Sequence, residues 1–335
     1  MKALVTLPKN AVFPTFFTPD NIALAESLGE IIWNETDRQL TTEEIIDRIG
    51  DCDTYITGWG SPRADRAILD AAPNLRILTH LCGTVVPFVS DALWERGIRV
   101  ISGNRFFAES VAEGTLAYML AALRDIPAYS TRLHDEHKWK KSTDTNQGLA
   151  GKKIGIISYG AIARHLVRIL SVFRVELYVY DIKPLPADDV LRYHLKQASM
   201  EEIFSTCDIV SVHTPLFDAT YHLIGKDLLG RLKEGALFLN TSRGPVIDQK
   251  ALEAELATGR FRAVLDVYEQ EPPAPDCPLF DLPNVMMMPH MGGPTVDLRA
   301  FITEQLLHES HDFLHNGSSL PSEITRQMAA TMSTR

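Results

Sequence analysis

Three side chains in the second half of the sequence could carry out chemistry together. Arg243 follows the run LFLNTS, and its planar fork of donors suits a carboxylate and a carbonyl beside it. Glu271 lies in a proline-rich stretch after AVLDVY. His290 follows NVMMMP and precedes Gly292 and Gly293, which let backbone approach a ligand. A guanidinium, a carboxylate and an imidazole can bind an anionic carbonyl compound and move a proton to it.

Each of these residues has a less specific interpretation when it is taken alone. A single arginine is usually a surface charge, a single histidine is more often structural, and Asp266, at the end of the apolar run AVL, could cap a helix. However, each of them follows a β-rich run, and open α/β sheets bind ligands beyond the carboxyl ends of their strands. Their shared placement favours one reaction centre.

The stretch GIISYGAIARHL, residues 155–166, is typical of a strand that leads into a helix, where dinucleotide-binding folds hold the pyrophosphate. Gly160 stands where backbone must approach the phosphates, but Ser158 replaces the first glycine of the usual motif. Serine can occupy this turn if its φ is negative, and its hydroxyl could supply one more phosphate donor. A free helix N-terminus after Gly160 would attract the anion. The expected cradle comprises Ser158, Tyr159, Gly160, Ala161 and Ile162, although a plain strand-to-helix turn is the alternative.

An acidic residue at the end of the following strand is the second feature of a dinucleotide site. The run ELYVYDIKP places Asp181 there, where its carboxylate could accept hydrogen bonds from ribose hydroxyls. A turn-capping role before Pro184 is the alternative. Because a carboxylate repels a ribose phosphate, Asp181 favours NAD(H) over NADP(H), and Lys183 weakens this preference without reversing it.

The elements that must position these residues alternate along the chain. Short β-rich runs such as KALVTL, EIIWN and LRILTHL alternate with helical patterns, and a second alternation begins at KIGIIS. This organisation predicts two parallel sheets, each covered by helices. Thr41 and Glu44 are predicted to form a capping box. A second box is predicted to open a helix from Ser110 to Leu123, with a break near Pro127.

Composition and charge narrow the class of protein. The chain has 335 residues, of which 45% are apolar, enough for two cores of ordinary domain size. A formal charge of −10 without a Lys/Arg block argues against a nucleic-acid partner. No signal peptide is recognised and no run approaches the length of a membrane span, so no membrane partner is expected. Four scattered cysteines fit reduced thiols, and we expect a cytoplasmic protein.

No metal site is expected. His308, His311 and His315 share one face of a helix expected from Asp297 to about residue 315. Because no carboxylate or cysteine joins them, a solvated stripe is the favoured interpretation.

The segment from His213 to Arg299 resembles the D-isomer-specific 2-hydroxyacid dehydrogenase family. The likeness is carried by HTPLFDATYHLIG, LKEGALFLNTSRGPVIDQKALEAEL and LDVYEQEPPAPDCPLFDLPNVMMMPHMGG, and it is looser over residues 75–181. It implies reduction of a 2-keto acid to a D-2-hydroxy acid, or the reverse, with NAD(H); glyoxylate and hydroxypyruvate types are candidate substrates. It also implies two flavodoxin-like or Rossmann-like parallel-sheet domains. An NAD-binding domain of residues 105–298 would be inserted into a substrate domain of residues 1–104 and 299–335.

The resemblance also implies a role for individual residues. Arg243, Glu271 and His290 match the family's catalytic trio: Arg243 and His290 would contact both substrate and cofactor, and Glu271 would favour the charged form of His290. Asp266 matches the residue that holds the nicotinamide carboxamide. The segment HLCGTVVPFVS resembles the substrate loop, whose backbone N–H groups take the substrate carboxylate. The remaining implied contacts are Cys82, Gly83 and Thr84 for the substrate, and His213, Thr214, Pro215, Thr220, Thr241, Ser242, Gly292 and Gly293 for the cofactor.

Some residues depart from the family pattern. Ser158 for glycine, and Ala161 where an arginine often lies, predict looser cofactor binding, and Cys82 with Val85 and Val86 makes the usual substrate unsafe to assume. The alternative function is an NAD(H)-sensing regulatory or scaffold protein of the same fold. The intact catalytic trio counts against it, because a sensor needs no proton donor. The resemblance further suggests a homodimer through the cofactor domains, with a small 2-keto or 2-hydroxy acid as ligand.

Overall fold

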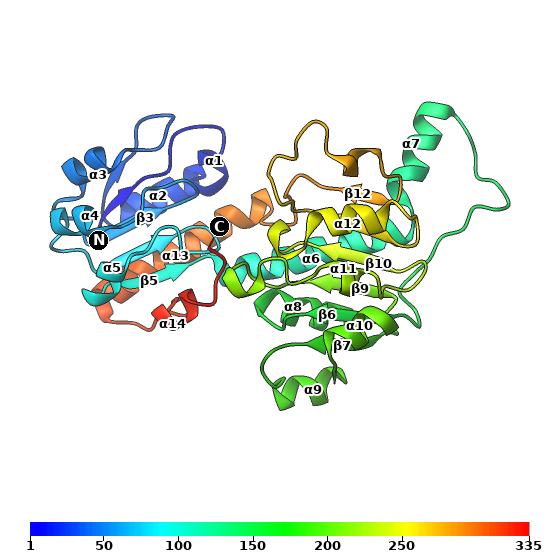
Figure 1. Ribbon diagram of the computed structural model, residues 1–335. Helices are drawn as coiled ribbons and strands as arrows, with labels where there is room; N and C mark the ends of the chain where they lie inside the picture. Colours follow the sequence, from blue (N-terminus) through cyan, green and yellow to red (C-terminus); the bar gives the residue numbers. More distant parts are fainter. Residues whose placement is uncertain (335) are drawn as a thin grey trace. The chain divides into compact units, whose positions relative to one another are not determined.

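The structure, a computed structural model that describes residues 1–334, contains two compact units (Figure 1). Unit 1 comprises residues 1–107 together with the chain from Pro294 onward, and unit 2 comprises Ala108–Gly293. The division expected from the sequence, 1–104 with 299–335 against 105–298, differs from these bounds by a few residues at both junctions. At the first junction a single long helix, which starts at Asn104, runs from one unit into the other.

Unit 1 is built on a five-stranded parallel sheet in the order β2-β1-β3-β4-β5. The strands β3 and β4 are buried throughout, as expected for a parallel sheet covered on both faces. The strands are β1 (Lys2–Val5), β2 (Glu30–Trp33), β3 (Thr54–Thr57), β4 (Ile77–His80) and β5 (Arg99–Ser102). The helices are α1 (Phe13–Phe16), α2 (Pro19–Leu28), α3 (Thr42–Ile49), α4 (Arg66–Ala71), α5 (Asp91–Glu95), α13 (Val296–Asn316) and α14 (Arg326–Ala329).

Two helices of unit 1 confirm predictions made from the sequence. Thr41 accepts a hydrogen bond from the Glu44 N–H, and the Glu44 carboxylate accepts one from the Thr41 N–H, so the predicted capping box opens α3. The expected helical tail is α13, which ends before Gly317, where a φ of 65° stops the helix. Ile302 and Leu306 of α13 are fully buried in one core cluster with residues of β1 and β4. The C-terminal helix therefore completes the core of unit 1.

Unit 2 is built on a seven-stranded parallel sheet in the order β12-β11-β10-β9-β6-β7-β8. The chain starts in the middle of this sheet and moves first to one side and then to the other, so the carboxyl ends of β6 and β9 flank a switch in strand order, where α/β sheets bind ligands. The strands are β6 (Lys153–Ile157), β7 (Glu176–Tyr180), β8 (Lys196–Gln197), β9 (Ile209–Val212), β10 (Leu237–Asn240), β11 (Arg262–Leu265) and β12 (Val285–Met287).

Helices and short turns connect the strands of unit 2. The α-helices are α6 (Asn104–Leu123), α7 (Ile126–Glu136), α8 (Ala161–Leu170), α9 (Ala187–Tyr193), α10 (Met200–Thr206), α11 (Lys226–Leu229) and α12 (Gln249–Leu256). Three 3-10 turns lie at η1 (Asp218–Thr220), η2 (Gly244–Val246) and η3 (Pro278–Asp281). Figure 1 shows α7 extending away from the sheet of this unit.

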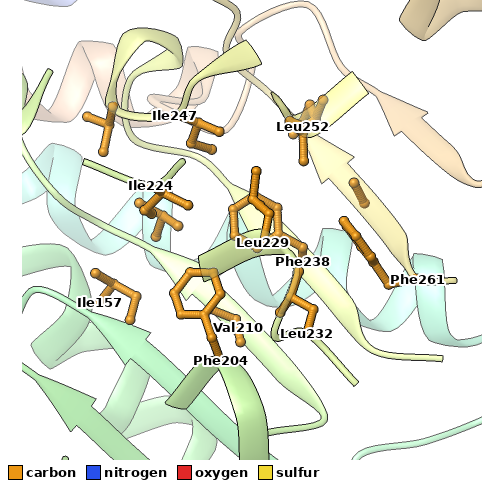
Figure 2. Packing of buried hydrophobic residues seen from close by; sticks show 14 of the residues in the cluster. Ile157, Phe204, Val210, Ile224, Leu229, Leu232, Phe238, Ile247, Leu252 and Phe261 are labelled. Carbon is orange, nitrogen blue, oxygen red and sulfur yellow. The ribbon is translucent and has the colours of Figure 1, made fainter. Parts of the chain in front are cut away.

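Aromatic and branched side chains form one of the cores of unit 2 (Figure 2). Phe204 of α10 and Phe238 of β10 are fully buried, and their ring centroids lie 6.1 Å apart. Phe261 and Leu252 belong to the same cluster. Dense packing of this kind fixes the strands β10 and β11, whose carboxyl ends lead to candidate site residues.

The helix α6 begins at Asn104, and not at Ser110 as the sequence predicts. The Ser102 hydroxyl accepts a hydrogen bond from the Asn104 N–H, so the helix is capped well before the predicted box. The break expected near Pro127 is present, but it lies just before that residue. Asp125, with a φ of 51°, separates the two helices, and Pro127 occupies the first turn of α7, a position that proline tolerates.

The helix α6 also corrects the expectation that no run approaches the length of a membrane span. By length and composition alone, this helix of 20 residues is long and apolar enough to cross a membrane. However, Ala112, Met119 and Leu123 of α6 pack in a core cluster of unit 2 with residues of β6 and α8. A helix that is buried in the core of a globular domain is also long and apolar, so it meets the same criteria of length and composition.

Candidate active site

His290 and Glu271 form a hydrogen-bonded pair beyond the carboxyl ends of β11 and β12. Nδ1 of His290 lies 2.7 Å from Oε2 of Glu271, and the other carboxylate oxygen accepts a hydrogen bond from the Tyr268 N–H at 3.0 Å. Burial alone would raise the pKa of Glu271, but the hydrogen bonds from His290 and Tyr268 outweigh it and lower that pKa. Glu271 is therefore an anion at neutral pH. Because Nδ1 is engaged, Nε2 is the His290 atom that can exchange a proton with a substrate.

Arg243 lies in the turn after β10, and a glycine brings this turn against the Glu271 loop. A Cβ on Gly244 would lie 1.9 Å from the carbonyl carbon and oxygen of Tyr268, so only glycine permits this approach. Asn240 holds the turn, because its side-chain N–H donates to the Arg243 carbonyl at 3.0 Å. Burial lowers the pKa of Arg243, and the charge of Glu271 acts in the opposite direction. The structure thus brings Arg243 within electrostatic reach of the Glu271 carboxylate.

Asp266 fixes the turn that follows His290, a role that the sequence did not indicate. It is 2% exposed, and its two carboxylate oxygens accept hydrogen bonds from the N–H groups of Met291 and Gly292, both at 2.8 Å. A Cβ on Gly292 would lie 2.8 Å from Oδ2 of Asp266, so this close approach also needs glycine. The Tyr118 hydroxyl lies 3.4 Å from Oδ1. These contacts hold His290 at a φ of 55°.

The pairing of β11 with β12 explains why Asp266 reaches this turn. Asp266 follows β11 directly, His290 lies shortly after β12, and the two strands are parallel neighbours. A buried acid after one strand and a glycine pair after the next were the signals that could have revealed the contact. The implied contact between Asp266 and a nicotinamide carboxamide stays a prediction.

Ser158 has a φ of 75°, so the condition that the sequence reasoning set for a serine in this turn, a negative φ, is not met. The turn between β6 and α8 needs the left-handed backbone that glycine normally supplies, and a serine adopts it at a cost of about 1 kcal/mol. The Ser158 N–H donates to the Tyr180 carbonyl at 2.8 Å, and the Ser158 hydroxyl lies 2.8 Å from that of Thr214. The hydroxyl expected to act as a phosphate donor is thus engaged with Thr214.

The helix N-terminus expected after Gly160 is open. Gly160 is the N-cap residue of α8 and makes no side-chain capping bond, and a Cβ added there would meet no atom within 4 Å. The first N–H groups of α8, from Ala161 and Ile162 onward, can therefore bind an anion. Asp181 lies beside the same turn, because its Oδ2 accepts a hydrogen bond from the Tyr159 N–H at 2.7 Å. At the switch in strand order, these residues fit a dinucleotide.

The other residues implied at the cofactor site follow β9 and β10. His213 is buried, its Nε2 lies 3.0 Å from a serine hydroxyl of β9, and burial lowers its pKa to about 4. Thr220 donates to the Pro215 carbonyl at 2.7 Å and so shapes the loop between them. The Thr241 hydroxyl lies 2.9 Å from that of Thr115 on α6. These contacts order the loops. That the residues of these loops contact a cofactor stays a prediction.

The expected substrate loop lies in unit 1, after β4. The Thr84 hydroxyl donates to the Ser333 carbonyl at 2.7 Å, and the Ser102 hydroxyl donates to the Gly83 carbonyl at 2.8 Å. Cys82 is buried, and burial raises the pKa of its thiol, so the sulfur stays protonated at neutral pH. Within residues 1–334, the backbone N–H groups of Cys82, Gly83 and Thr84 donate no hydrogen bond to the protein. Their binding of a carboxylate stays a prediction.

The histidines of α13 do not form a metal-binding group. His311 and His315 stack with ring centroids 4.0 Å apart, and Nδ1 of His311 lies 3.2 Å from the neighbouring Asp312 carboxylate. Over residues 1–334, no set of three or more His, Cys, Asp or Glu side chains is arranged to hold a metal ion.

Known proteins are similar to this chain in both sequence and fold. Residues 116–292 match the family model "D-isomer specific 2-hydroxyacid dehydrogenase, NAD binding domain". A glyoxylate reductase of Thermofilum pendens is 31% identical over 303 residues, which cover 89% of this chain and 88% of that protein. The crystal structure of the TT0316 protein from Thermus thermophilus matches with a TM-score of 0.77 at 28% identity, covering 97% of this chain and 100% of that one.

A second relative is longer than this chain. A D-3-phosphoglycerate dehydrogenase of Methanocaldococcus jannaschii is 32% identical over 278 residues, which cover 82% of this chain. The aligned residues span about half, 52%, of that relative. The family model matches unit 2, where the open helix N-terminus, Asp181 and the His290–Glu271 pair are found. These matches show that the chain belongs to the D-isomer-specific 2-hydroxyacid dehydrogenase family.

Proposed function

We propose that this NAD-dependent oxidoreductase reduces 2-keto acids, with glyoxylate and hydroxypyruvate among them, to D-2-hydroxy acids, or catalyses the reverse reaction. The observation that carries the proposal is the 2.7 Å hydrogen bond between His290 and Glu271, within electrostatic reach of Arg243. Support also comes from the family and from a relative that is a glyoxylate reductase.

The residues of unit 2 divide the chemical tasks between them. NAD(H), when bound, supplies or accepts the hydride. Arg243 binds the substrate carboxylate and polarises the carbonyl, which stabilises the negative charge that develops on the carbonyl oxygen. His290 donates a proton from Nε2 to that oxygen. Glu271 stabilises the imidazolium by accepting a hydrogen bond from Nδ1, and Asp266 keeps the His290 turn in place.

The cofactor preference belongs to the same proposal. The carboxylate of Asp181 lies beside the Ser158–Gly160 turn, where it would repel the additional phosphate of NADP(H). We therefore expect a lower KM for NADH than for NADPH, and the change of Asp181 to alanine should narrow the difference. An unchanged cofactor ratio in that variant would remove Asp181 from the recognition of the ribose.

Assembly and location complete the proposal. We infer a homodimer from the family resemblance. We infer a location in the cytoplasm from the four cysteines, which are all free and buried. Sedimentation analysis of the purified chain tests the dimer, and a fractionation of the source cells tests the location.

The decisive experiment is a substrate panel. Glyoxylate, hydroxypyruvate, pyruvate and bulkier phenyl or branched 2-keto acids are supplied with NADH or NADPH, and the loss of reduced-cofactor absorbance is followed. The change of His290 to alanine should lower kcat by about 10²–10⁴-fold, the usual contribution of a positioned proton donor. A wild-type chain that binds NADH tightly but reduces no acid of the panel would contradict the proposal and would fit the sensing alternative, which the assembled His290–Glu271 pair does not favour.

A further inference from the structure

An apolar pocket lies at the carboxyl edge of the unit 1 sheet. Its volume is about 210 Å³, and it is lined largely by aromatic and aliphatic side chains. They come from the segment after β1, from α1 and the residue before it, and from the segment after β3. The lining includes Leu7, Val12, Phe13, Phe16 and Trp59.

The walls of this pocket are held in a fixed arrangement. The Trp59 ring meets the Phe16 ring edge to face, with centroids 5.4 Å apart. The Arg299 guanidinium lies over both rings, 5.1 Å from the centroid of Trp59 and 5.7 Å from that of Phe16. The side chain of Gln39 donates a hydrogen bond to the Trp59 carbonyl at 2.6 Å. Trp59 is 45% exposed, yet it is anchored on several sides, so the pocket exists before a ligand arrives.

The Trp59 wall of the pocket lies close to the expected substrate loop. Thr57 of β3 pairs with His80 of β4, so Trp59 and Cys82 each follow their strand by the same number of residues. The rings of Trp59 and Phe107 have centroids 6.4 Å apart, and the Phe107 ring comes within 3.6 Å of a Cβ placed on Gly83. A substrate whose carboxylate meets the N–H groups of this loop therefore has Trp59 as its neighbour.

We propose that this pocket receives the side chain of the 2-keto acid, so that acids with an aromatic or branched aliphatic side chain are better substrates than glyoxylate. The inference rests on the proposed function. A cavity of about 150 Å³ with apolar walls is large enough for benzene, so a pocket of about 210 Å³ is enough for a phenyl or isobutyl group. Glyoxylate carries only a hydrogen at that position and would leave the walls without contact. Burial of such a side chain should raise kcat/KM by about 10- to 100-fold.

The test compares kcat/KM for phenylpyruvate and 4-methyl-2-oxopentanoate with the value for glyoxylate. The change of Val12 to phenylalanine fills the pocket from its rim, where Val12 is 40% exposed, and the change of Trp59 to alanine removes one wall. The matched control changes Val172 to phenylalanine, because this valine is 83% exposed on unit 2, outside the pocket. Melting temperatures of all variants establish that they are folded.

The proposal expects a wild-type ratio of phenylpyruvate to glyoxylate of about ten or more. That ratio should fall towards one in both pocket variants and stay unchanged in the Val172 control. A wild-type ratio near one, or a ratio that neither pocket variant changes, would overturn the pocket inference while the proposed function stands. Failure of the wild-type chain to reduce any of the three acids would overturn the proposed function, and the inference with it.

Discussion

The pairing of Glu271 with His290 leads to a quantitative prediction for the change of Glu271 to glutamine. The amide keeps the shape of the side chain but removes the negative charge that faces Nδ1 of His290. A hydrogen bond to a charged group contributes about 1.5–3 kcal/mol. Because the two side chains are 46% and 36% exposed, solvent screens their attraction, and about 1–2 kcal/mol is the better expectation.

This free energy corresponds to a decrease in kcat of roughly 5- to 30-fold, since 1.4 kcal/mol is a factor of ten. The change of His290 to alanine removes the proton donor itself, and its expected loss is about 10²–10⁴-fold. The assay is the initial rate of NADH oxidation with a saturating 2-keto acid, measured for both variants at several pH values. Equal losses in the two variants would refute the supporting role given to Glu271.

The pH dependence of the wild type follows from the lowered pKa of Glu271. The pKa lies below the ordinary 4.5, so the carboxylate stays charged in mild acid, and its support for His290 is lost only as the pH falls through the lowered pKa.

The change of Glu269 to glutamine is a matched control, in the same loop, for the change of Glu271 to glutamine. Glu269 pairs with His222 at 3.0 Å and with the Tyr221 hydroxyl at 3.3 Å, and its loss should leave kcat near the wild-type value.

Three further changes test other parts of unit 2. Ser158→Gly should be more stable than Ser158→Ala by about 1 kcal/mol in urea unfolding, because both lose the hydroxyl but only glycine adopts a φ of 75° without strain; equal stabilities would argue against the strained turn. Asp266→Asn leaves one N–H of the His290 turn without its acceptor, which should cost about 1–3 kcal/mol of stability and lower kcat/KM; a variant with wild-type melting temperature and rate would contradict this. His213 has a folded pKa of about 4 against 6.5 when unfolded, so its stabilising contribution is complete above pH 6.5 and is lost as the pH falls towards 4. We expect roughly 2 kcal/mol less stability at pH 5 from this residue, and His213→Gln should flatten the pH dependence of the unfolding free energy.

The placement of the candidate catalytic residues after strands could be predicted from the sequence because it depends on strong local patterns. Arg243, Glu271 and His290 each follow an apolar run, and parallel strands bring their carboxyl ends to one edge of a sheet. The strand-to-helix turn after β6, where a phosphate cradle is expected, was recognisable for the same reason. Buried strands and helix starts are encoded by neighbouring residues, as the box of Thr41 and Glu44 shows.

Features that depend on contacts between distant segments could not be predicted in this way. The φ of Ser158 is set by the turn that joins β6 to α8 and by the contact with Thr214, which is far away in the sequence. The hold of Asp266 on the His290 turn requires β11 and β12 to be neighbours. The start of α6 at Asn104 depends on Ser102, a residue whose local pattern does not mark it as a cap.

The contact between Gly244 and Tyr268 limits how this centre can change during evolution. The backbones of two loops touch there with no space for even one additional carbon atom. Any mutation of Gly244 would separate the guanidinium from the carboxylate at the same time as it disturbs each loop. We therefore expect a change in one of these loops to be tolerated only when the other loop keeps this contact.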